Sequence, residues 1–168
     1  ETLEDPDTMP RIYLDHNAST PVRPEVLEAM LPYFGEHFGN ASSAHAFGQE
    51  AKGAIEDARA QVAALLNASP AEIVFTSGGT ESDNLGVIGG ARALPIKGRH
   101  VIVSAIEHDA VRHAADELER EGFTVTRAAP NPRGVVEPGA VAGAIRPDTV
   151  LVSVMAANNE TGVVQPVA

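Results

Sequence analysis

The sequence predicts an α/β fold built on a mostly parallel, mixed sheet with helices on both faces. From about residue 72 onward, short apolar runs rich in β-branched residues alternate with longer segments whose apolar residues recur at helical spacing. The run at residues 149–154 is almost continuously apolar, which is typical of a strand covered on both faces. Because strands that alternate with helices are joined by right-handed crossovers, we expect them to lie parallel.

The part of the chain before residue 72 is expected to be mainly helical. Pro24 suits the first turn of a helix, and Pro32 should weaken or bend the last turn of the same helix. A longer helix with one apolar and one charged face is expected at residues 44–66. Residues 69–72 match a capping box, but a β-rich run follows at once, so they are interpreted as a turn.

The remaining elements follow in alternation. Strands are predicted at residues 72–76, 100–104, 123–127 and 149–154, and helices at residues 80–94, 108–121 and 137–145. Gly122 is a natural stop for the second of these helices. The chain ends without a further helix or strand to cover the sheet, so we expect the domain to be incomplete at its C-terminus.

The composition excludes several classes of partner and site. The formal net charge of −11 argues against a nucleic-acid partner. The chain has no Cys, and therefore neither a disulfide framework nor a thiolate metal site. His108 and His113 are five residues apart, the wrong spacing for two metal ligands on one helix face, so no metal is expected. With no apolar run near the ~20 residues of a membrane span and an acidic start, we expect a cytoplasmic protein without a membrane partner.

The segment at residues 76–84 joins a predicted strand to a predicted helix through two glycines. Gly78 and Gly79 allow a tight turn and a close approach of the backbone to a ligand. The first helical turn leaves N–H groups unpaired and carries about half a positive charge, and the hydroxyls of Thr80 and Ser82 add further donors. A phosphate group suits this place. An ordinary turn with Thr80 or Ser82 as N-cap explains the same residues, and neither a Walker loop nor a dinucleotide fingerprint is present.

Three polar clusters fall at the carboxyl ends of predicted strands. They are residues 77–82, residues 107–108 and residues 158–159. Ligands of open α/β sheets bind outside the carboxyl ends of the strands. The sequence therefore predicts that the three clusters form one site.

Several segments resemble, in the same order, the N-terminal part of a cysteine desulfurase, a pyridoxal-phosphate enzyme of the class V branch of the aspartate-aminotransferase fold type. These segments are residues 13–21, 38–40, 43–45, 73–84, 107–108, 121–123 and 158–162. The resemblance implies an aminotransferase-like large domain, of which residues 21–168 are the N-terminal part. Residues 1–20 would be an acidic leader followed by a segment that joins the small domain.

The resemblance also implies roles for individual residues toward pyridoxal 5'-phosphate. Gly79 and Thr80 would bind the cofactor phosphate, Thr80 through both its backbone and its hydroxyl. His108 would stack on the pyridine ring and take part in proton transfer as the catalytic residue, since imidazole is flat and titrates near neutral pH. A single His near a helix start is more often a surface or capping residue, and this alternative stays open.

Two further positions are assigned by the resemblance. Asn159 would donate a hydrogen bond to the phenolic oxygen of the cofactor, although Asn158 is a close neighbour and a loop Asn usually bonds its own backbone. Asn17 and Ala18 would lie on the substrate side. Ser19 stands where many relatives carry Thr, which retains the hydroxyl.

The activity implied by the resemblance needs residues that this chain lacks. A Schiff-base Lys must reach the cofactor aldehyde, and a Cys must take the sulfur of L-cysteine as a persulfide, leaving L-alanine. Neither Lys52 nor Lys97 matches the Lys of the family, and there is no Cys. We therefore expect half of a site, inactive alone, that the missing remainder or a second chain completes. Association as a homodimer and a sulfur acceptor protein for iron–sulfur cluster assembly or thiolation are implied in the same way.

Two other functions remain open on the sequence. One is a non-catalytic, truncated fold that binds a phosphate-bearing ligand or a partner. The other is a sister enzyme of the same branch, such as a selenocysteine lyase or an aminotransferase, although residues 107–111 favour a desulfurase.

Overall fold

The structure is a computed structural model that describes residues 12–94 and 98–167. The chain divides into two compact units, Glu1–Val74 and Phe75–Ala168, and each is described by itself. The predicted acidic leader and Lys97 lie outside the described residues. In the described parts, no helix combines the length and apolarity that a membrane crossing requires.

The first unit is helical, as predicted. Its elements are α1 (Pro24–Met30), a 3-10 turn (Leu31–Phe34), α2 (Ala46–Leu65) and a second 3-10 turn (Pro70–Glu72). Pro32 lies in the first 3-10 turn, which confirms that the helix changes its geometry there. His45 caps α2 by accepting a hydrogen bond on its ring from the backbone N–H of Gly48 (3.4 Å).

The prediction of a strand at residues 72–76 is wrong. Residues 73–76 are irregular, and a single 3-10 turn precedes them. The capping box that the sequence analysis set aside does form, since the backbone N–H of Ser69 donates to Oε2 of Glu72 (2.7 Å). A strand requires a hydrogen-bonded neighbour, which an apolar run does not supply by itself. The carbonyl of Ile73 instead accepts a hydrogen bond from Nη1 of Arg59 (2.6 Å).

The second unit alternates helices and strands. Its elements are α3 (Gly79–Asn84), a π-helical segment (Leu85–Gly89), α4 (Gly90–Ala93), β1 (His100–Ser104), α5 (Asp109–Arg120), β2 (Thr124–Ala128), α6 (Pro138–Ala144) and β3 (Thr149–Ser153). The helix predicted at residues 80–94 is thus one continuous run with a π segment in its middle. Gly122 follows α5 with a φ of 87°, a left-handed conformation that suits glycine and confirms the predicted stop.

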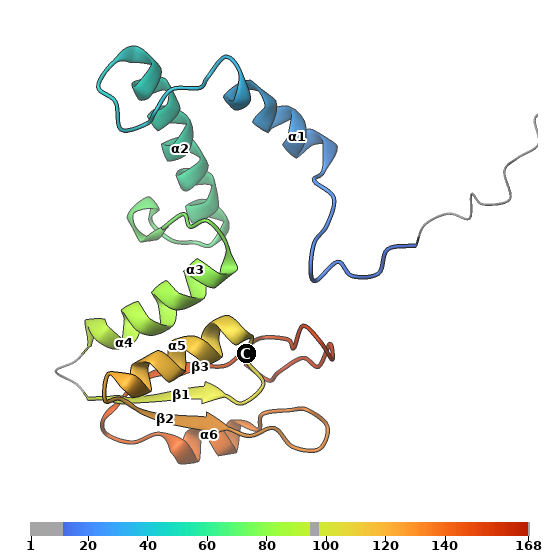
Figure 1. Cartoon of the computed structure of the whole chain (residues 1–168), viewed down its shortest axis with the longest axis vertical. Coiled ribbons are helices and arrows are strands. Elements are labelled where there is room, and N and C mark those ends of the chain that lie inside the picture. Colours follow the sequence, from blue (N-terminus) through green and yellow to red (C-terminus); the bar gives the residue numbers. More distant parts are fainter. Residues whose placement is uncertain (1–11, 95–97, 168) are drawn as a thin grey trace, which may run out of the picture. The chain divides into compact units, whose positions relative to one another are not determined.

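The three strands of this unit form a parallel sheet in the order β2-β1-β3. The chain first moves outward from β1 to β2 through α5 and then returns past β1 to β3 through α6. Two right-handed crossovers in opposite directions place their helices on opposite faces of a sheet. Figure 1 shows this arrangement, with α5 on one face and α6 on the other. The predicted parallel α/β fold with helices on both faces is confirmed.

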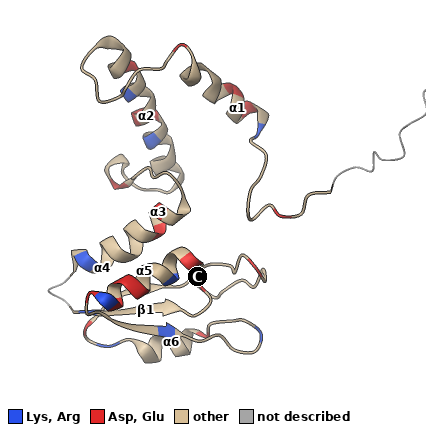
Figure 2. Cartoon of the chain, viewed as in Figure 1, with Lys and Arg blue, Asp and Glu red and all other residues tan. Residues whose placement is uncertain are grey.

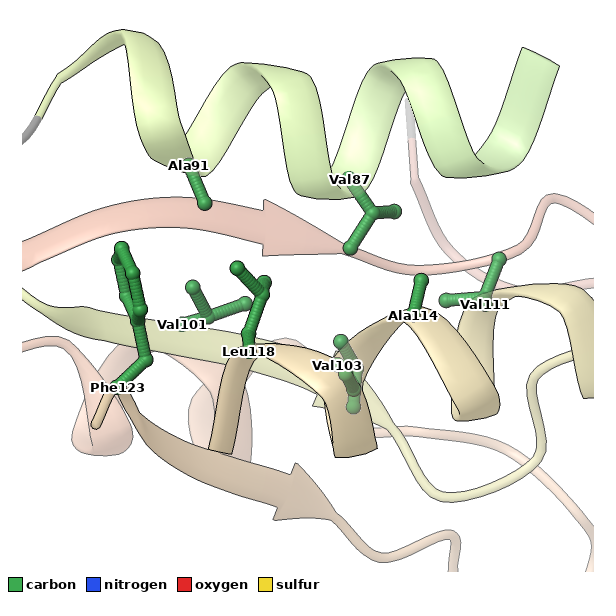
Figure 3. Close-up of a cluster of buried hydrophobic side chains, with 9 residues drawn as sticks. Val87, Ala91, Val101, Val103, Val111, Ala114, Leu118 and Phe123 are labelled. Atoms are coloured by element: carbon green, nitrogen blue, oxygen red, sulfur yellow. The ribbon is translucent and has the colours of Figure 1, made fainter. Parts of the chain in front are cut away.

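The core lies on both sides of the central strand. Val101 and Val103 of β1 pack against Leu118 of α5, and the helix that runs through α3 and α4 closes the same cluster with Val87 and Ala91 (Figure 3). On the opposite face the next residue of the strand, Ile102, packs with residues 128 and 136 and against α6. All five residues of β1 are buried, as the alternation of side chains across a doubly covered sheet requires.

Many of the charged residues of the second unit belong to α5 (Figure 2). Arg127 of β2 pairs with Asp116 (2.6 Å) and Glu119 (2.9 Å) of α5. The hydrogen bond from Arg127 lowers the pKa of the Glu119 carboxyl. These groups are partly exposed, so the pairs contribute little to stability beyond fixing the contact between helix and strand.

A drop in stability on mild acidification is expected from His100. This side chain is fully buried, and its ring nitrogens lie 2.7 Å from Oγ1 of Thr149 and 2.8 Å from Oγ1 of Thr126. Burial, helped by Arg146, lowers the pKa of His100 below 6.5, so below that pH the unfolded chain binds a proton that the folded chain does not. The free energy of unfolding should therefore fall as the pH drops from 7.5 to 5.5, by at most about 1.4 kcal/mol per pH unit.

Urea unfolding at several pH values measures this dependence. His100→Gln should flatten it, whereas His113→Gln, an exposed position of α5, should not. An unchanged slope in the His100 variant would remove this histidine as the cause.

Candidate functional site

An open pocket of about 390 Å³ lies at the carboxyl ends of β1 and β3. It is lined by residues 105–108, which connect β1 to α5, by Asp109 and Arg112 of α5 and by residues 158–161, which follow β3. The pocket thus brings together two of the three polar clusters, including His108 and Asn159. The parallel sheet explains this proximity, because carboxyl ends of adjacent parallel strands meet at one edge.

His108 is the N-cap of α5. Its Nδ1 accepts a hydrogen bond from the backbone N–H of Ala110 (3.1 Å), and its side chain is otherwise exposed. The capping role considered in the sequence analysis is therefore present. In a neutral ring with this bond the proton is on Nε2, so the cap fixes both the tautomer and the orientation of a ring that remains open to a ligand.

The two neighbouring asparagines after β3 differ in their surroundings. The Oδ1 of Asn158 accepts hydrogen bonds from the backbone N–H groups of Glu160 (3.1 Å) and Thr161 (2.8 Å) and from the Thr161 hydroxyl (3.0 Å). Its Nδ2 donates to the carbonyl of Ile106 (3.0 Å). Asn159 is exposed at the pocket, where its Nδ2 lies 2.9 Å from Oε1 of Glu160. The carboxamide of Asn158 is thus engaged in the structure of the loop, and that of Asn159 is presented to solvent.

The turn that leads into α3 is held by its own side chains. Glu81 accepts hydrogen bonds from the backbone N–H (2.6 Å) and the hydroxyl (2.7 Å) of Ser77, and these bonds lower the pKa of its carboxyl, the backbone bond most. The hydroxyl of Ser82 lies 2.6 Å from that of Thr76. The hydroxyls of Thr80 and Ser82 were both predicted to face an anion. The Ser82 hydroxyl is used within the turn. The Thr80 hydroxyl makes no hydrogen bond within the described residues.

Gly79 and Thr80 do not line the pocket that contains His108 and Asn159. They begin α3, which packs against α5 in the same unit. In Figure 1, α3 starts on the side to which the strand arrowheads point. The third polar cluster, residues 77–82, therefore lies toward the same carboxyl-terminal edge of the sheet as the other two, but outside the pocket itself.

Asn17 and Ala18 belong to the other unit, and both are exposed. They lie in a turn closed by the carbonyl of Asp15, which accepts hydrogen bonds from the backbone N–H groups of Ala18 (3.1 Å) and Ser19 (3.3 Å). The hydroxyl of Tyr13 donates to the same carbonyl (2.8 Å). These hydrogen bonds close the turn, and small and polar residues suit such a turn.

The groups at this end of the second unit suit pyridoxal phosphate. The first helical hydrogen bond of α3 runs from Ser82 N–H to Gly78 O (3.1 Å), so the amides of residues 79–81 have no partner inside the helix. A Cβ added at Gly79 would meet nothing within 4 Å, so the backbone borders open space. Amide and hydroxyl donors suit a phosphate, an exposed imidazole suits the face of a ring, and a carboxamide suits an oxygen anion.

The sequence did not reveal the hydrogen bonds of Glu107 or the position of Arg112 in the pocket. Glu107 is only 7% exposed and accepts hydrogen bonds on Oε1 from the Ser104 hydroxyl (2.8 Å) and the backbone N–H of Met155 (2.7 Å). Arg112 lines the pocket and pairs with Asp109 (2.8 Å). The sequence indicated only that Glu107 adjoins His108. Met155, which donates to Glu107, lies 48 residues away in the chain, and no local pattern reveals such a contact.

Comparison with known proteins gives consistent results. The family described as Aminotransferase class-V matches residues 12–168. "Cysteine desulfurase IscS" of Anaeromyxobacter sp. (strain K) is 56% identical over 158 residues, which are 94% of this chain and 39% of that protein. "Putative cysteine desulfurase IscS 1" of Bacillus subtilis is 50% identical over 159 residues, which are 95% of this chain and 42% of that protein.

Solved structures agree with the sequence matches. A structure titled "NIFS-LIKE PROTEIN" has a TM-score of 0.88 and 43% identity, and the match covers 93% of this chain and 43% of that one. "SspA in complex with cysteine" has a TM-score of 0.85 and 44% identity, covering 92% of this chain and 44% of that one. This chain spans about two fifths of the length of the curated relatives that it matches. It belongs to the aminotransferase class-V family.

Proposed function

We propose that this chain is the N-terminal part of a pyridoxal-phosphate-dependent cysteine desulfurase. The assembled enzyme, meaning this chain together with residues that supply a Lys and a Cys, takes sulfur from L-cysteine and leaves L-alanine. The observation that supports this best is the identity of 50–56% to curated cysteine desulfurases over nearly the whole chain. The pocket formed by His108 and Asn159 agrees with it, because it presents an imidazole and a carboxamide at one place.

In this proposal the residues before and in α3 bind the cofactor. The backbone N–H of Gly79 and the N–H and hydroxyl of Thr80 donate to its phosphate, and the positive end of the helix favours the negative charge. Glu81 is held by Ser77, so its carboxylate does not take up these donors. When bound, pyridoxal phosphate supplies an electron sink for the negative charge that develops on the substrate carbon.

The pocket residues orient the reaction and move a proton. His108 would pack against the ring of the cofactor, and its Nε2 would be the atom that exchanges a proton with the substrate, because Nδ1 is engaged in the cap of α5. Asn159 donates from Nδ2 to the phenolic oxygen and stabilises its ionised form. Asn17 and Ala18 contribute to the substrate side.

The sulfur step takes place on a Cys outside this chain, because this chain has none. The Cβ–Sγ bond of L-cysteine breaks, the sulfur joins the thiol of that Cys as a persulfide, and L-alanine leaves. Residues outside this chain also supply the Lys, since neither Lys52 nor Lys97 stands at the position of the family's Schiff-base Lys. A homodimer of the complete enzyme, a cytoplasmic location and transfer of the sulfur to an acceptor protein complete the proposal.

Mixing experiments test the proposed function. This chain is combined with a candidate chain that carries a Lys after Ser-x-His and a Cys, pyridoxal phosphate is added, and L-alanine formed from L-cysteine is measured. We expect alanine only from the mixture, with each chain inactive alone, because each holds part of the site. Selenocysteine in place of cysteine serves as the comparison substrate.

The outcomes separate the alternatives. A mixture that binds pyridoxal phosphate but forms neither alanine nor sulfide would contradict a desulfurase and favour a non-catalytic binding role. Turnover of selenocysteine but not of cysteine would indicate a selenocysteine lyase.

A further inference from the structure

Two residues next to the proposed site residues link the two pocket loops, each through a hydrogen bond between its side chain and the backbone of the other loop. Glu107, immediately before His108, accepts on Oε1 the backbone N–H of Met155 beyond β3 (2.7 Å). Asn158, immediately before Asn159, donates from Nδ2 to the carbonyl of Ile106 beyond β1 (3.0 Å). Each loop thus holds the other through the residue that precedes its functional side chain.

Both residues are also anchored within their own loops. The same Oε1 of Glu107 accepts the hydroxyl of Ser104, at the end of β1 (2.8 Å). Asn158 accepts three hydrogen bonds on Oδ1 from residues 160 and 161, which fold the turn that presents Asn159. Since the side chain of Glu107 is almost fully buried, losing a donor would leave a buried polar oxygen without a hydrogen bond, which is unfavourable.

We infer that Glu107 and Asn158 are positioning residues that set the distance and orientation of His108 relative to Asn159. This inference rests on the proposed function, because it gives the pair a role in the desulfurase reaction. Catalysis needs reacting groups held to within a fraction of an ångström, and a shift of about 1 Å lowers the rate about 100-fold.

Asn158→Asp is the most direct test in the assembled enzyme. Aspartate retains an oxygen for the bonds from residues 160 and 161 but has no donor for the carbonyl of Ile106 or for Sδ of Met155 (3.6 Å), so the bond to the other loop is lost while the turn keeps its acceptor. We expect kcat for alanine formation to fall about 10- to 100-fold with little change in KM. Hydrogen–deuterium exchange of the backbone at residues 155–162 should become faster, because this loop loses its bond to the carbonyl of Ile106.

Asn131→Asp is the matched control. Asn131 also accepts backbone N–H bonds on Oδ1, from Arg133 (2.8 Å) and Val135 (3.2 Å), and donates from Nδ2 to Glu137 (2.6 Å), but it does not line the pocket. Its substitution should lower stability without changing kcat or the exchange at residues 155–162. An equal fall in kcat in both variants would overturn the inference.

A double-mutant cycle distinguishes positioning from general destabilisation. If Asn158 acts through His108, the effect of Asn158→Asp on kcat should shrink to less than about threefold when His108→Asn is already present. The same factor in both backgrounds would overturn the inference. Glu107→Gln, which keeps the acceptor oxygen, should retain more activity than Glu107→Ala.

The exchange measurement is independent of turnover. A wild-type enzyme that forms no alanine would contradict the proposed function alone. Unchanged exchange at residues 155–162 in Asn158→Asp would contradict the link between the loops, whether or not the enzyme is active.

Discussion

Replacing His108 by asparagine in the assembled enzyme is expected to lower kcat for alanine formation by roughly 10²- to 10⁴-fold, the usual contribution of general acid–base catalysis. The structure allows this effect to be separated from folding, because His108 is both the N-cap of α5 and a pocket residue. Asparagine is among the best N-caps, so the helix start should be preserved. It has no titratable ring, so it neither moves a proton at neutral pH nor covers the cofactor. Steady-state kinetics and thermal unfolding measure the two properties.

Two further variants distinguish the loss of the helix cap from the loss of the imidazole. His108→Ala removes the cap as well, so it should cost about 1 kcal/mol of stability in addition to the loss of activity. His113→Asn makes the same chemical change on the exposed side of the same helix and should leave kcat unchanged. Activity within threefold of wild type for His108→Asn would limit His108 to capping.

Replacing Thr80 by valine is expected to raise the dissociation constant of pyridoxal phosphate by roughly 10- to 150-fold. A hydrogen bond to a charged group contributes about 1.5–3 kcal/mol, and valine retains the shape of threonine without the hydroxyl. The first-turn amides of α3 remain, so binding should be weakened rather than abolished. Titration of the cofactor into the assembled enzyme, followed by its absorbance, measures the change.

The conservative variant and a distant one control this experiment. Thr80→Ser retains the hydroxyl and should remain within about threefold of wild type. Thr124→Val, at an exposed position of β2, makes the same substitution outside the site and should have no effect on cofactor binding. An unchanged dissociation constant in Thr80→Val would show that the hydroxyl does not contact the phosphate.

Local patterns were sufficient for most elements of the second unit. The apolar runs that became β1 and β3 and the helical spacing of α5 reflect side-chain periods of two and 3.6, which are readable along the chain. The run at residues 72–76 has a similar composition but is irregular, because its backbone groups bond elsewhere, as the contact between Arg59 and Ile73 shows. Composition measures the tendency to form a strand, whereas pairing decides whether one forms.

The candidate site divides in the same way. The glycine turn and the polar residues after β1 and β3 were visible in the sequence, since helix starts and strand ends have characteristic residues. The resemblance favoured Asn159 over its neighbour Asn158, and the structure shows how the two differ, because Asn158 bonds both its own loop and the carbonyl of Ile106.

The sequence by itself thus determined the alternating α/β architecture and the kinds of groups available to a phosphate and a ring, because both depend on residues close together in the chain. Only the tertiary structure decided that His108 and Asn159 line one pocket while Gly79 and Thr80 lie outside it. It also decided that Glu107 reaches Met155, 48 residues further on. These contacts arise from the order β2-β1-β3, which places β1 and β3 side by side, and such long-range proximity leaves no trace in local spacing.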